Sequence, residues 1–334
     1  MCPNSAAPPG GALASRAPLS PPGSGLDAAR AEAGLSPAGG FHYPAASSDT
    51  LAPIKFTLSG SDKDDEALYD NFDEAKMGER QQAAVEKFLA ADHRLFLSTP
   101  CPPDVGMMRT IVTRRRKGRF SAPEYICETA QGHRFLMKAT KKSKGPLKPA
   151  QYMLWSKLES AENDSQWFDG RLTPNVANKT YTLTMRGPEK PRRELAAIFV
   201  APNEKSRMLP RQMAVAVPVP PTRGPAPGFL RRGQTLRSVA QSETGAGSLV
   251  TLVNKVPEWR HELGMYSLNF AARVKQASVK NVQLHPIDDE ANVVFQFGRR
   301  DADTFCLDWK WPLTPRQAFA TALVSFDSSI GTEW

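Results

Sequence analysis

An uncharged stretch near the end of the chain, residues 318–326 (AFATALVSF), is the feature that most restricts the fold. It follows Thr314, Pro315 and Gln317, which match the N-cap, the first helical residue and the third residue of a capping box. A helix that is apolar on every side is buried on every side. We therefore predict a central helix over residues 312–327 that the rest of the domain encloses.

The residues before this helix show the two-residue periodicity of β-strands. Runs of β-branched and aromatic residues, set apart by Gly and Pro, recur from about residue 93. They lie at 108–114, 124–128, 134–138, 151–155, 179–184, 194–200, 212–217, 249–253, 266–270, 277–284, 292–297 and 303–309. About a dozen strands with no helix between them favour a sandwich or a barrel. A closed barrel encloses one helix completely, so we predict a mainly β fold: a closed antiparallel barrel of roughly twelve strands around a hydrophobic C-terminal helix.

The chain divides into three parts. Of its first 50 residues, 34 are Ala, Pro, Gly or Ser, so residues 1–63 are expected to form a disordered leader. Residues 64–92 carry an apolar stripe at helical spacing and are interpreted as a helical linker or as a segment that docks a partner. Residues 93–334 form the predicted barrel domain, and its Pro- and Gly-rich segment 218–247 is expected to be a flexible loop.

Composition excludes several classes of protein. No apolar run reaches the roughly 18–20 residues that cross a bilayer, and no secretory signal is expected. The four cysteines are scattered, which argues against a disulfide framework and for a reducing compartment. The five histidines lack neighbours at metal-ligand spacing, and nucleophile and phosphate-loop motifs are absent. We therefore expect no enzyme activity, no metal and no cofactor.

The basic residues carry the functional information. The chain has 43 Lys and Arg against 34 Asp and Glu, a net charge of +9. Clusters lie at 114–119, 138–148 and 190–193, with Arg171 between them. One such run is usually a solvated face, but several on neighbouring strands favour a polyanionic partner. Because exposed aromatic residues for base stacking do not accompany the clusters, an anionic membrane headgroup fits better than nucleic acid.

Several segments of the C-terminal half resemble the Tubby-like family. They are 253–259 (VNKVPEW), 266–274 (YSLNFAARV), 277–284 (ASVKNVQL), 294–299 (VFQFGR), 305–309 (FCLDW), 312–320 (PLTPRQAFA) and 325–327 (SFD). Upstream, 134–144, 194–197 and 210–213 are also similar, so the resemblance spans residues 93–334. It implies a closed twelve-stranded barrel around a C-terminal helix. It also implies binding of phosphatidylinositol 4,5-bisphosphate, with roles as an adaptor for ciliary membrane proteins and as a releasable nuclear regulator.

The resemblance also implies a set of lipid-binding residues. The family's Lys-Leu-Arg element corresponds to Arg171-Leu172-Thr173, so its second basic residue is a threonine here. A family Asn corresponds to Gln151, and the Arg of the family's Arg-Gln-Glu-Leu-Ala-Ala segment corresponds to Arg192. The expected headgroup-binding residues are Arg171, Arg192, Gln151 and Thr173, with Lys141, Lys142 and Lys144 as helpers.

Three functional hypotheses follow. The first is a phosphoinositide-binding adaptor, expected as a monomer in the cytoplasm and at the plasma membrane, with partners in trafficking complexes or cargo and a possible place in the cilium or nucleus. The second is a nucleic-acid-binding or transcriptional regulator that uses the basic cluster 114–119. The third is a lipid-independent scaffold that works through residues 64–92.

Overall fold

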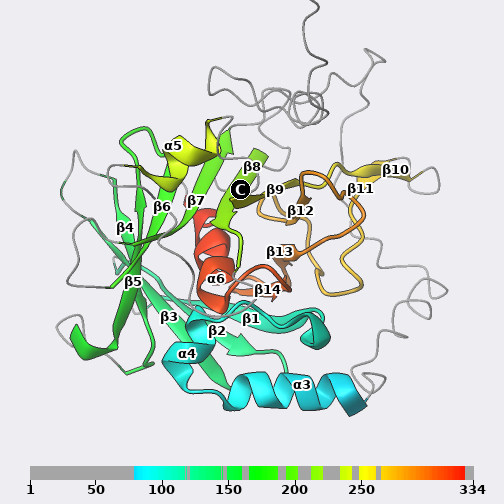
Figure 1. The fold of residues 1–334 in the computed structure, drawn as a ribbon, viewed down its shortest axis with the longest axis horizontal. Helices are drawn as coiled ribbons and strands as arrows, with labels where there is room; N and C mark the ends of the chain where they lie inside the picture. Colours follow the sequence, from blue (N-terminus) through cyan, green and yellow to red (C-terminus); the bar gives the residue numbers. More distant parts are fainter. Residues whose placement is uncertain are drawn as a thin grey trace, which may run out of the picture.

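The structure, a computed structural model, places most of the chain from residue 79 to residue 327 in a single barrel with short helices around it (Figure 1). The residues that it describes are 79–116, 118, 121–143, 145, 149–159, 165–186, 193–201, 212–220, 234–242, 248–260 and 265–327. Three predicted parts lie wholly or partly outside them: the leader (residues 1–63), the first half of the helical segment (residues 64–78) and the greater part of the loop 218–247.

Twelve strands form the barrel, and two more form a small separate sheet. The barrel strands are β1 (Met108–Arg115), β2 (Glu124–Thr129), β3 (Phe135–Lys142), β4 (Gln151–Trp155), β5 (Phe168–Pro174), β6 (Thr180–Met185), β7 (Glu194–Ala201), β8 (Gln212–Pro218), β9 (Leu249–Asn254), β12 (Val282–Pro286), β13 (Phe295–Arg299) and β14 (Thr304–Trp309). The small sheet pairs β10 (Glu258–Arg260) with β11 (Met265–Ser267).

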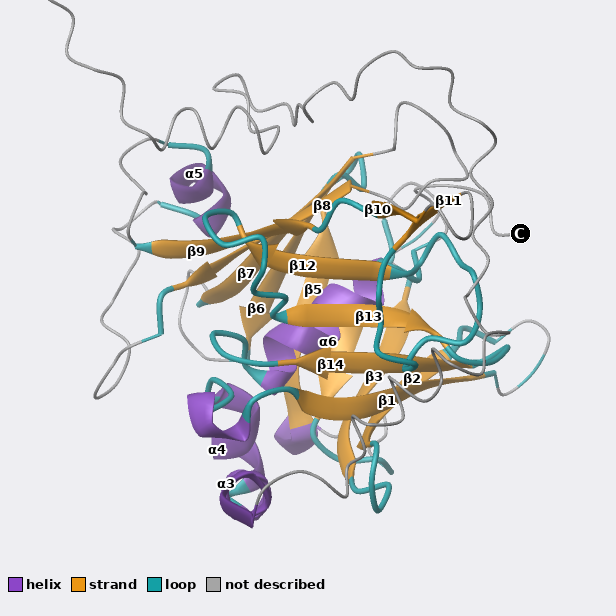
Figure 2. Ribbon diagram, turned by 90° about the vertical axis from the view of Figure 1, so that its right-hand side faces the viewer, coloured by secondary structure: helices purple, strands orange, loops and turns teal. Residues whose placement is uncertain are grey.

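The barrel is closed and antiparallel throughout. Around it the strands run in the order β1-β14-β13-β12-β9-β8-β7-β6-β5-β4-β3-β2, and β2 pairs again with β1. Figure 2 shows β1, β14, β13, β12 and β9 side by side on the near wall. Closure leaves no open edge in this sheet. The prediction of a closed, roughly twelve-stranded antiparallel barrel is confirmed.

The central helix is α6 (Pro315–Val324), and all ten of its residues are buried. The Thr314 side chain accepts a hydrogen bond from the Gln317 backbone N–H, and the Gln317 side chain accepts one from the Thr314 N–H, as the capping-box pattern predicts. Phe319 and Leu323 belong to the main apolar core together with inward residues of nearly every barrel strand. Figure 1 shows α6 inside the ring of strands, which confirms the enclosed helix.

The outer helices are short and lie against the barrel. They are α3 (Glu79–Ala90), α4 (His93–Ser98) and α5 (Leu236–Ala240), with single 3-10 turns η2 (Pro103–Val105) and η3 (Ser165–Trp167). Phe88 of α3 packs against Phe96 of α4, with 4.7 Å between the centroids of the tilted rings. Leu236 of α5 packs on Ala197, Phe199 and neighbouring residues of the outer face of β7 and β8.

Three local predictions were wrong, and one strand was not predicted. Strand periodicity was expected from residue 93, but Asp92 caps α4 by accepting hydrogen bonds from the backbone N–H groups of Arg94 and Leu95. The expectation of no helix between the strands missed α5, whose capping box begins at Thr235. The predicted strand 266–270 contributes only β11 to the small sheet, and the barrel's remaining strand is instead the unpredicted β5.

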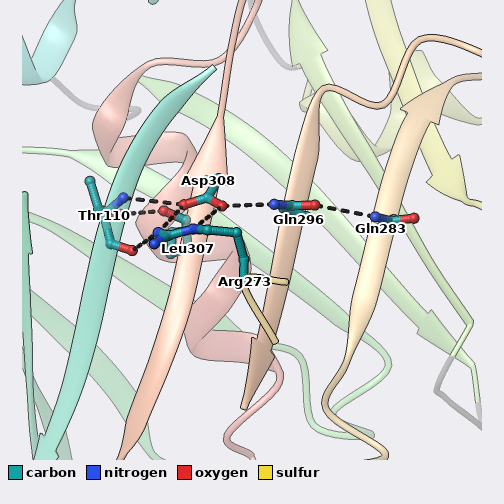
Figure 3. A network of polar contacts seen from close by, with 6 residues as sticks. All are labelled: Thr110, Arg273, Gln283, Gln296, Leu307 and Asp308. Atoms are coloured by element: carbon teal, nitrogen blue, oxygen red, sulfur yellow. Dashed lines mark hydrogen bonds and ion pairs between the residues drawn. The ribbon is translucent and has the colours of Figure 1, made fainter. Parts of the chain in front are cut away.

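A buried polar network joins the segment before β12 to the outer face of the barrel (Figure 3). The Arg273 guanidinium donates to both carboxylate oxygens of Asp308, at 2.9 and 2.7 Å, and to the Thr110 carbonyl at 3.1 Å. Asp308 also accepts from the Thr110 backbone N–H and from Gln296 Nε2. Since Asp308 is fully buried, these donors replace the water that its charge loses on folding.

Candidate functional site

The outer face of β3, β4 and β5 gathers four of the seven residues predicted to bind a headgroup. Side chains alternate along a strand, and Tyr152 of β4 and Leu172 of β5 are both fully buried in the core. Arg171 and Thr173 flank Leu172 and therefore face outward. Lys142 of β3 pairs with Gln151 of β4, and Arg171 pairs with Met153, so the antiparallel register brings Thr173 level with Gln151.

β5 positions Arg171 and Thr173 although its sequence, FDGRLTP, contains both Gly and Pro. A Cβ at Gly170 would lie 2.6 Å from the Thr184 carbonyl oxygen, so glycine lets β5 approach β6 closely. The Arg171 guanidinium lies 5.7 Å from the centroid of the Phe168 ring, which supports it from the same strand. The position of Arg171 thus depends on strand pairing and on a ring contact.

Two buried polar atoms beside Arg171 and Thr173 have no hydrogen-bond partner within the described part of the chain. They are the Gln151 Oε1 atom and the Thr184 Oγ1 atom. Thr184 of β6 pairs directly with Arg171, and Gln151 is only 5% exposed. Buried polar atoms are nearly always hydrogen-bonded, so each calls for a water molecule or a ligand group. Both atoms belong to strands that border the outward-facing pair.

Lys141 lies on the other side of the sheet from Lys142. It pairs with the inward-facing Tyr152, and its Nζ atom lies 5.5 Å from the centroid of that ring. The same Nζ atom is 3.3 Å from Asp327 Oδ1, and the Tyr181 hydroxyl donates to Asp327 Oδ2 at 2.9 Å. The structure therefore joins Lys141 to Asp327, three residues after the last residue of α6, and does not bring it to the outer face.

The other two predicted residues, Lys144 and Arg192, lie outside the described residues. Two residues that extend the outward polar face were not predicted: Thr182 and Thr184 of β6, which pair with Thr173 and Arg171. A signal for them was present, because Thr180, Thr182 and Thr184 alternate with buried Tyr181 and Leu183 in a predicted strand. The gathered face consists of Lys142, Gln151, Arg171, Thr173, Thr182 and Thr184, and we call it the β3–β6 face.

The basic cluster at 114–119 is only partly described. Arg114 Nε lies 2.7 Å from Asp303 Oδ1 in the β13–β14 hairpin, so an acidic neighbour offsets its charge. Arg115 and Arg116 are exposed at the end of β1. β1 and β5 are separated by four inter-strand spacings, about 19 Å along the sheet. The cluster is thus remote from Arg171 and Thr173, although it lies at the same rim as Lys142, two strands away.

The described cysteines are unsuited to nucleophilic chemistry. Burial raises the pKa of the Cys101 thiol to about 12, with a further contribution from Asp104. Burial also raises the pKa of Cys127 to about 12, and it raises the pKa of Cys306. All three thiols are protonated and shielded from solvent at neutral pH. Among the described residues, no group of three or more His, Cys, Asp or Glu side chains is arranged to hold a metal ion, and no helix has the length and apolar character to cross a membrane.

Known proteins are similar to the chain over most of its described length. The model of the Tub family matches residues 97–328. The chain is 33% identical to Tubby-related protein 1 of Mus musculus over 281 residues, which cover 77% of this chain and 50% of that protein. It is 34% identical to Tubby-related protein 1 of Homo sapiens over 263 residues, 72% of this chain and 46% of the relative.

A relative from insects gives the same result. The chain is 32% identical to protein king tubby of Drosophila virilis over 259 residues, which cover 72% of this chain and 54% of that protein. The chain thus spans about half the length of the curated relatives that it matches. With the closed barrel, the enclosed helix and a family model that covers more than half of the sequence, the chain belongs to the Tub family.

Proposed function

We propose that the chain binds phosphatidylinositol 4,5-bisphosphate through the β3–β6 face and acts as a non-enzymatic adaptor at the cytoplasmic side of a membrane. The observation that carries the proposal is the register of β3, β4 and β5, which sets Arg171 and Thr173 beside Gln151 and Lys142 on one outer surface. The function that the family resemblance implies, including delivery of membrane proteins to cilia, is consistent with such a tether.

The polar groups of the β3–β6 face suit a phosphorylated inositol. Arg171 supplies planar N–H donors that match phosphate oxygens, and the ammonium of exposed Lys142 adds a second cation. The Thr173 hydroxyl donates a hydrogen bond without adding charge. The Gln151 Oε1 atom, which has no partner among the described residues, accepts hydrogen bonds, and an inositol ring has hydroxyl groups that donate them. A bare phosphate would satisfy the cations and leave this acceptor unpaired.

Vesicle sedimentation of the full chain tests the proposal. Arg171→Ala is expected to weaken binding to vesicles that contain phosphatidylinositol 4,5-bisphosphate by about tenfold, the effect of losing one charge-assisted contact. Arg134→Ala is the matched control, because Arg134 is exposed in the β2–β3 turn at the other end of the barrel and the change in net charge is identical. Equal binding by the two variants would exclude the β3–β6 face as the headgroup site.

A gain-of-charge pair sharpens the test. Thr173→Arg adds a cation next to Arg171 and is expected to strengthen vesicle binding by several-fold, since each cation near an anionic surface contributes about 1 kcal/mol. Thr113→Arg makes the same substitution on β1, about 19 Å away along the sheet. A similar gain from both would indicate a general effect of charge. Duplex binding that falls steeply with salt, measured on the same proteins, would favour the nucleic-acid hypothesis.

A further inference from the structure

The hairpin that joins β5 to β6 presents the most exposed of the large apolar side chains in the described part of the chain. Val176 is 87% exposed, whereas the next most exposed, Leu95, is 60% exposed. Ala177 beside it is also exposed. A single exposed apolar residue is normal on a protein surface and has no function by itself. Its place relative to the proposed headgroup site is what makes Val176 informative.

The hairpin holds Val176 outward in a defined turn. Asn175 Oδ1 accepts hydrogen bonds from the backbone N–H groups of Lys179 and Thr180, at 2.9 and 3.1 Å. The Asn178 N–H donates to the Asn175 carbonyl at 3.0 Å, and Asn178 adopts the left-handed conformation with φ of 52°. Asparagine tolerates that conformation well. The turn is therefore ordered, and exposing Val176 requires no rearrangement.

Val176 lies beyond the headgroup site in the direction of the barrel axis. β5 ends at Pro174, and Val176 is the second residue beyond it, in the turn at the tip of the hairpin. Three fully extended residues would span about 10 Å, and barrel strands tilt by about 35–45°, so the turn places Val176 at most about 8 Å beyond Thr173 along the axis. The polar interfacial layer of one leaflet is about 5–8 Å thick. If the barrel axis stands along the membrane normal, a bilayer whose headgroup occupies Arg171 and Thr173 would therefore have its interfacial layer around Val176.

The charge around the hairpin tip suits an anionic surface. Residues 174–180 contain Lys179, which is exposed, and no acidic residue. Exposed Lys142 ends β3 at the same end of the barrel, because β3 and β5 run in the same direction. β9 also ends there, and Val256, two residues after its last residue, is 51% exposed and follows Lys255. Exposed valines beside lysines thus occur at two places on one rim of the barrel.

We infer that Val176 and Ala177 insert into the interfacial layer of an anionic bilayer while the β3–β6 face holds a headgroup. The inference rests on the proposed function and adds to it an orientation: the rim at which β3, β5 and β9 end faces the membrane. The apolar contact contributes to binding of a bilayer and contributes nothing to binding of a soluble headgroup. That difference separates this inference from the headgroup site itself.

The test compares two ligands on the full chain. Val176→Ser is expected to weaken binding to vesicles of phosphatidylcholine, phosphatidylserine and phosphatidylinositol 4,5-bisphosphate by about tenfold, the equivalent of one valine removed from an apolar layer. Binding of soluble inositol 1,4,5-trisphosphate, measured by calorimetry, is expected to be unchanged. Serine is neutral, so charge repulsion does not contribute. Val219→Ser is the matched control, because Val219 is 40% exposed just after β8, at the opposite rim.

The outcomes distinguish the two proposals. If Val176→Ser binds vesicles as tightly as the wild type while both bind the soluble headgroup, insertion is wrong and the headgroup site stands. If the wild type binds neither ligand, both proposals fail. Val176→Trp gives a direct measurement: its emission should shift to the blue on vesicles and be quenched by brominated lipid. An emission spectrum that vesicles leave unchanged would overturn the insertion.

Discussion

Lys141 Nζ lies 3.3 Å from Asp327 Oδ1, so the segment just after the central helix is joined to the end of β3. At the other end of α6, the Arg316 guanidinium donates to both carboxylate oxygens of Asp169 on β5. The enclosed helix is thus held at both ends by ion pairs to β3 and β5, two of the strands that form the β3–β6 face. The helix thus contacts two of the strands that carry the candidate site.

Removing the Asp327 side chain is expected to destabilise the folded protein. Asp327→Ala leaves the Tyr181 hydroxyl without this acceptor and Lys141 without this counter-ion, in a largely buried setting, and should lower the free energy of unfolding by about 3 kcal/mol. Urea denaturation measures the change. Asp303→Ala is the control: it breaks the pair with Arg114, but its side chain is 53% exposed and the loss should stay below about 1 kcal/mol. Equal losses of stability in the two variants would show that the buried Lys141–Asp327 pair contributes no more than the exposed Arg114–Asp303 pair.

The Arg273–Asp308 pair should control the segment that precedes β12. Arg273→Ala leaves the buried Asp308 carboxylate with fewer donors, which is expected to destabilise the protein by about 3 kcal/mol. Hydrogen exchange of residues 268–281 should accelerate more than exchange of β4 and β5 on the far side of the barrel. Arg273→Lys retains the charge without the bidentate contact, so its stability should lie between those of the wild type and Arg273→Ala. Uniform acceleration throughout the barrel would contradict a local clamp.

A methyl group at Gly298 is expected to be tolerated only when the side chain of neighbouring Val274 is made smaller. A Cβ at this position would lie 2.3 and 3.0 Å from the two methyl groups of Val274. Gly298→Ala should therefore cost about 1–3 kcal/mol through overpacking. Adding Val274→Ala removes both clashing methyl groups and should restore part of the loss in a double-mutant cycle. If the losses of stability from the two substitutions were strictly additive, the added methyl group would not clash with Val274.

Gly170 offers a contrasting case that links stability to binding. A Cβ there would meet the Thr184 backbone carbonyl at 2.6 Å, and a backbone atom cannot be trimmed by substitution. Gly170→Ala should force β5 away from β6, next to Arg171, and so lower vesicle binding as well as thermal stability. Gly298→Ala, on the opposite side of the barrel, should lower stability and leave binding by the folded protein unchanged. Unchanged binding by folded Gly170→Ala would argue that Arg171 does not need its strand position.

Stability is expected to fall at acidic pH partly because of His93. Burial lowers the pKa of His93 in the folded protein, where its Nε2 atom is 2.8 Å from the Leu136 carbonyl. The unfolded chain takes up a proton near pH 6.5, so this contribution is fully present above that value and is lost as the pH falls below it. Denaturant titrations between pH 7.5 and 5 should show a shallower decline for His93→Gln. An identical slope would contradict the prediction.

Much of the fold could be predicted because its signals are local. The uncharged stretch 318–326, together with a run of alternating strands, required an enclosed helix and a closed sheet, since burial on every side has few other solutions. The capping box at Thr314 marked where that helix begins. Arg171, Thr173 and Gln151 were identified as candidate site residues by resemblance to the family, and the structure adds where they lie.

The tertiary structure decided what local pattern leaves open. β5 has too much Gly, Pro and charge to be recognised alone, and it exists as a strand because β4 and β6 pair with it on both sides. Lys141 and Lys142 are chemically identical neighbours in the sequence. Because side chains alternate across a sheet, register sends Lys141 to Asp327 at the barrel interior and Lys142 to the outer face. The sequence determined that a basic barrel would form, and strand register alone decided which of its basic residues face a ligand.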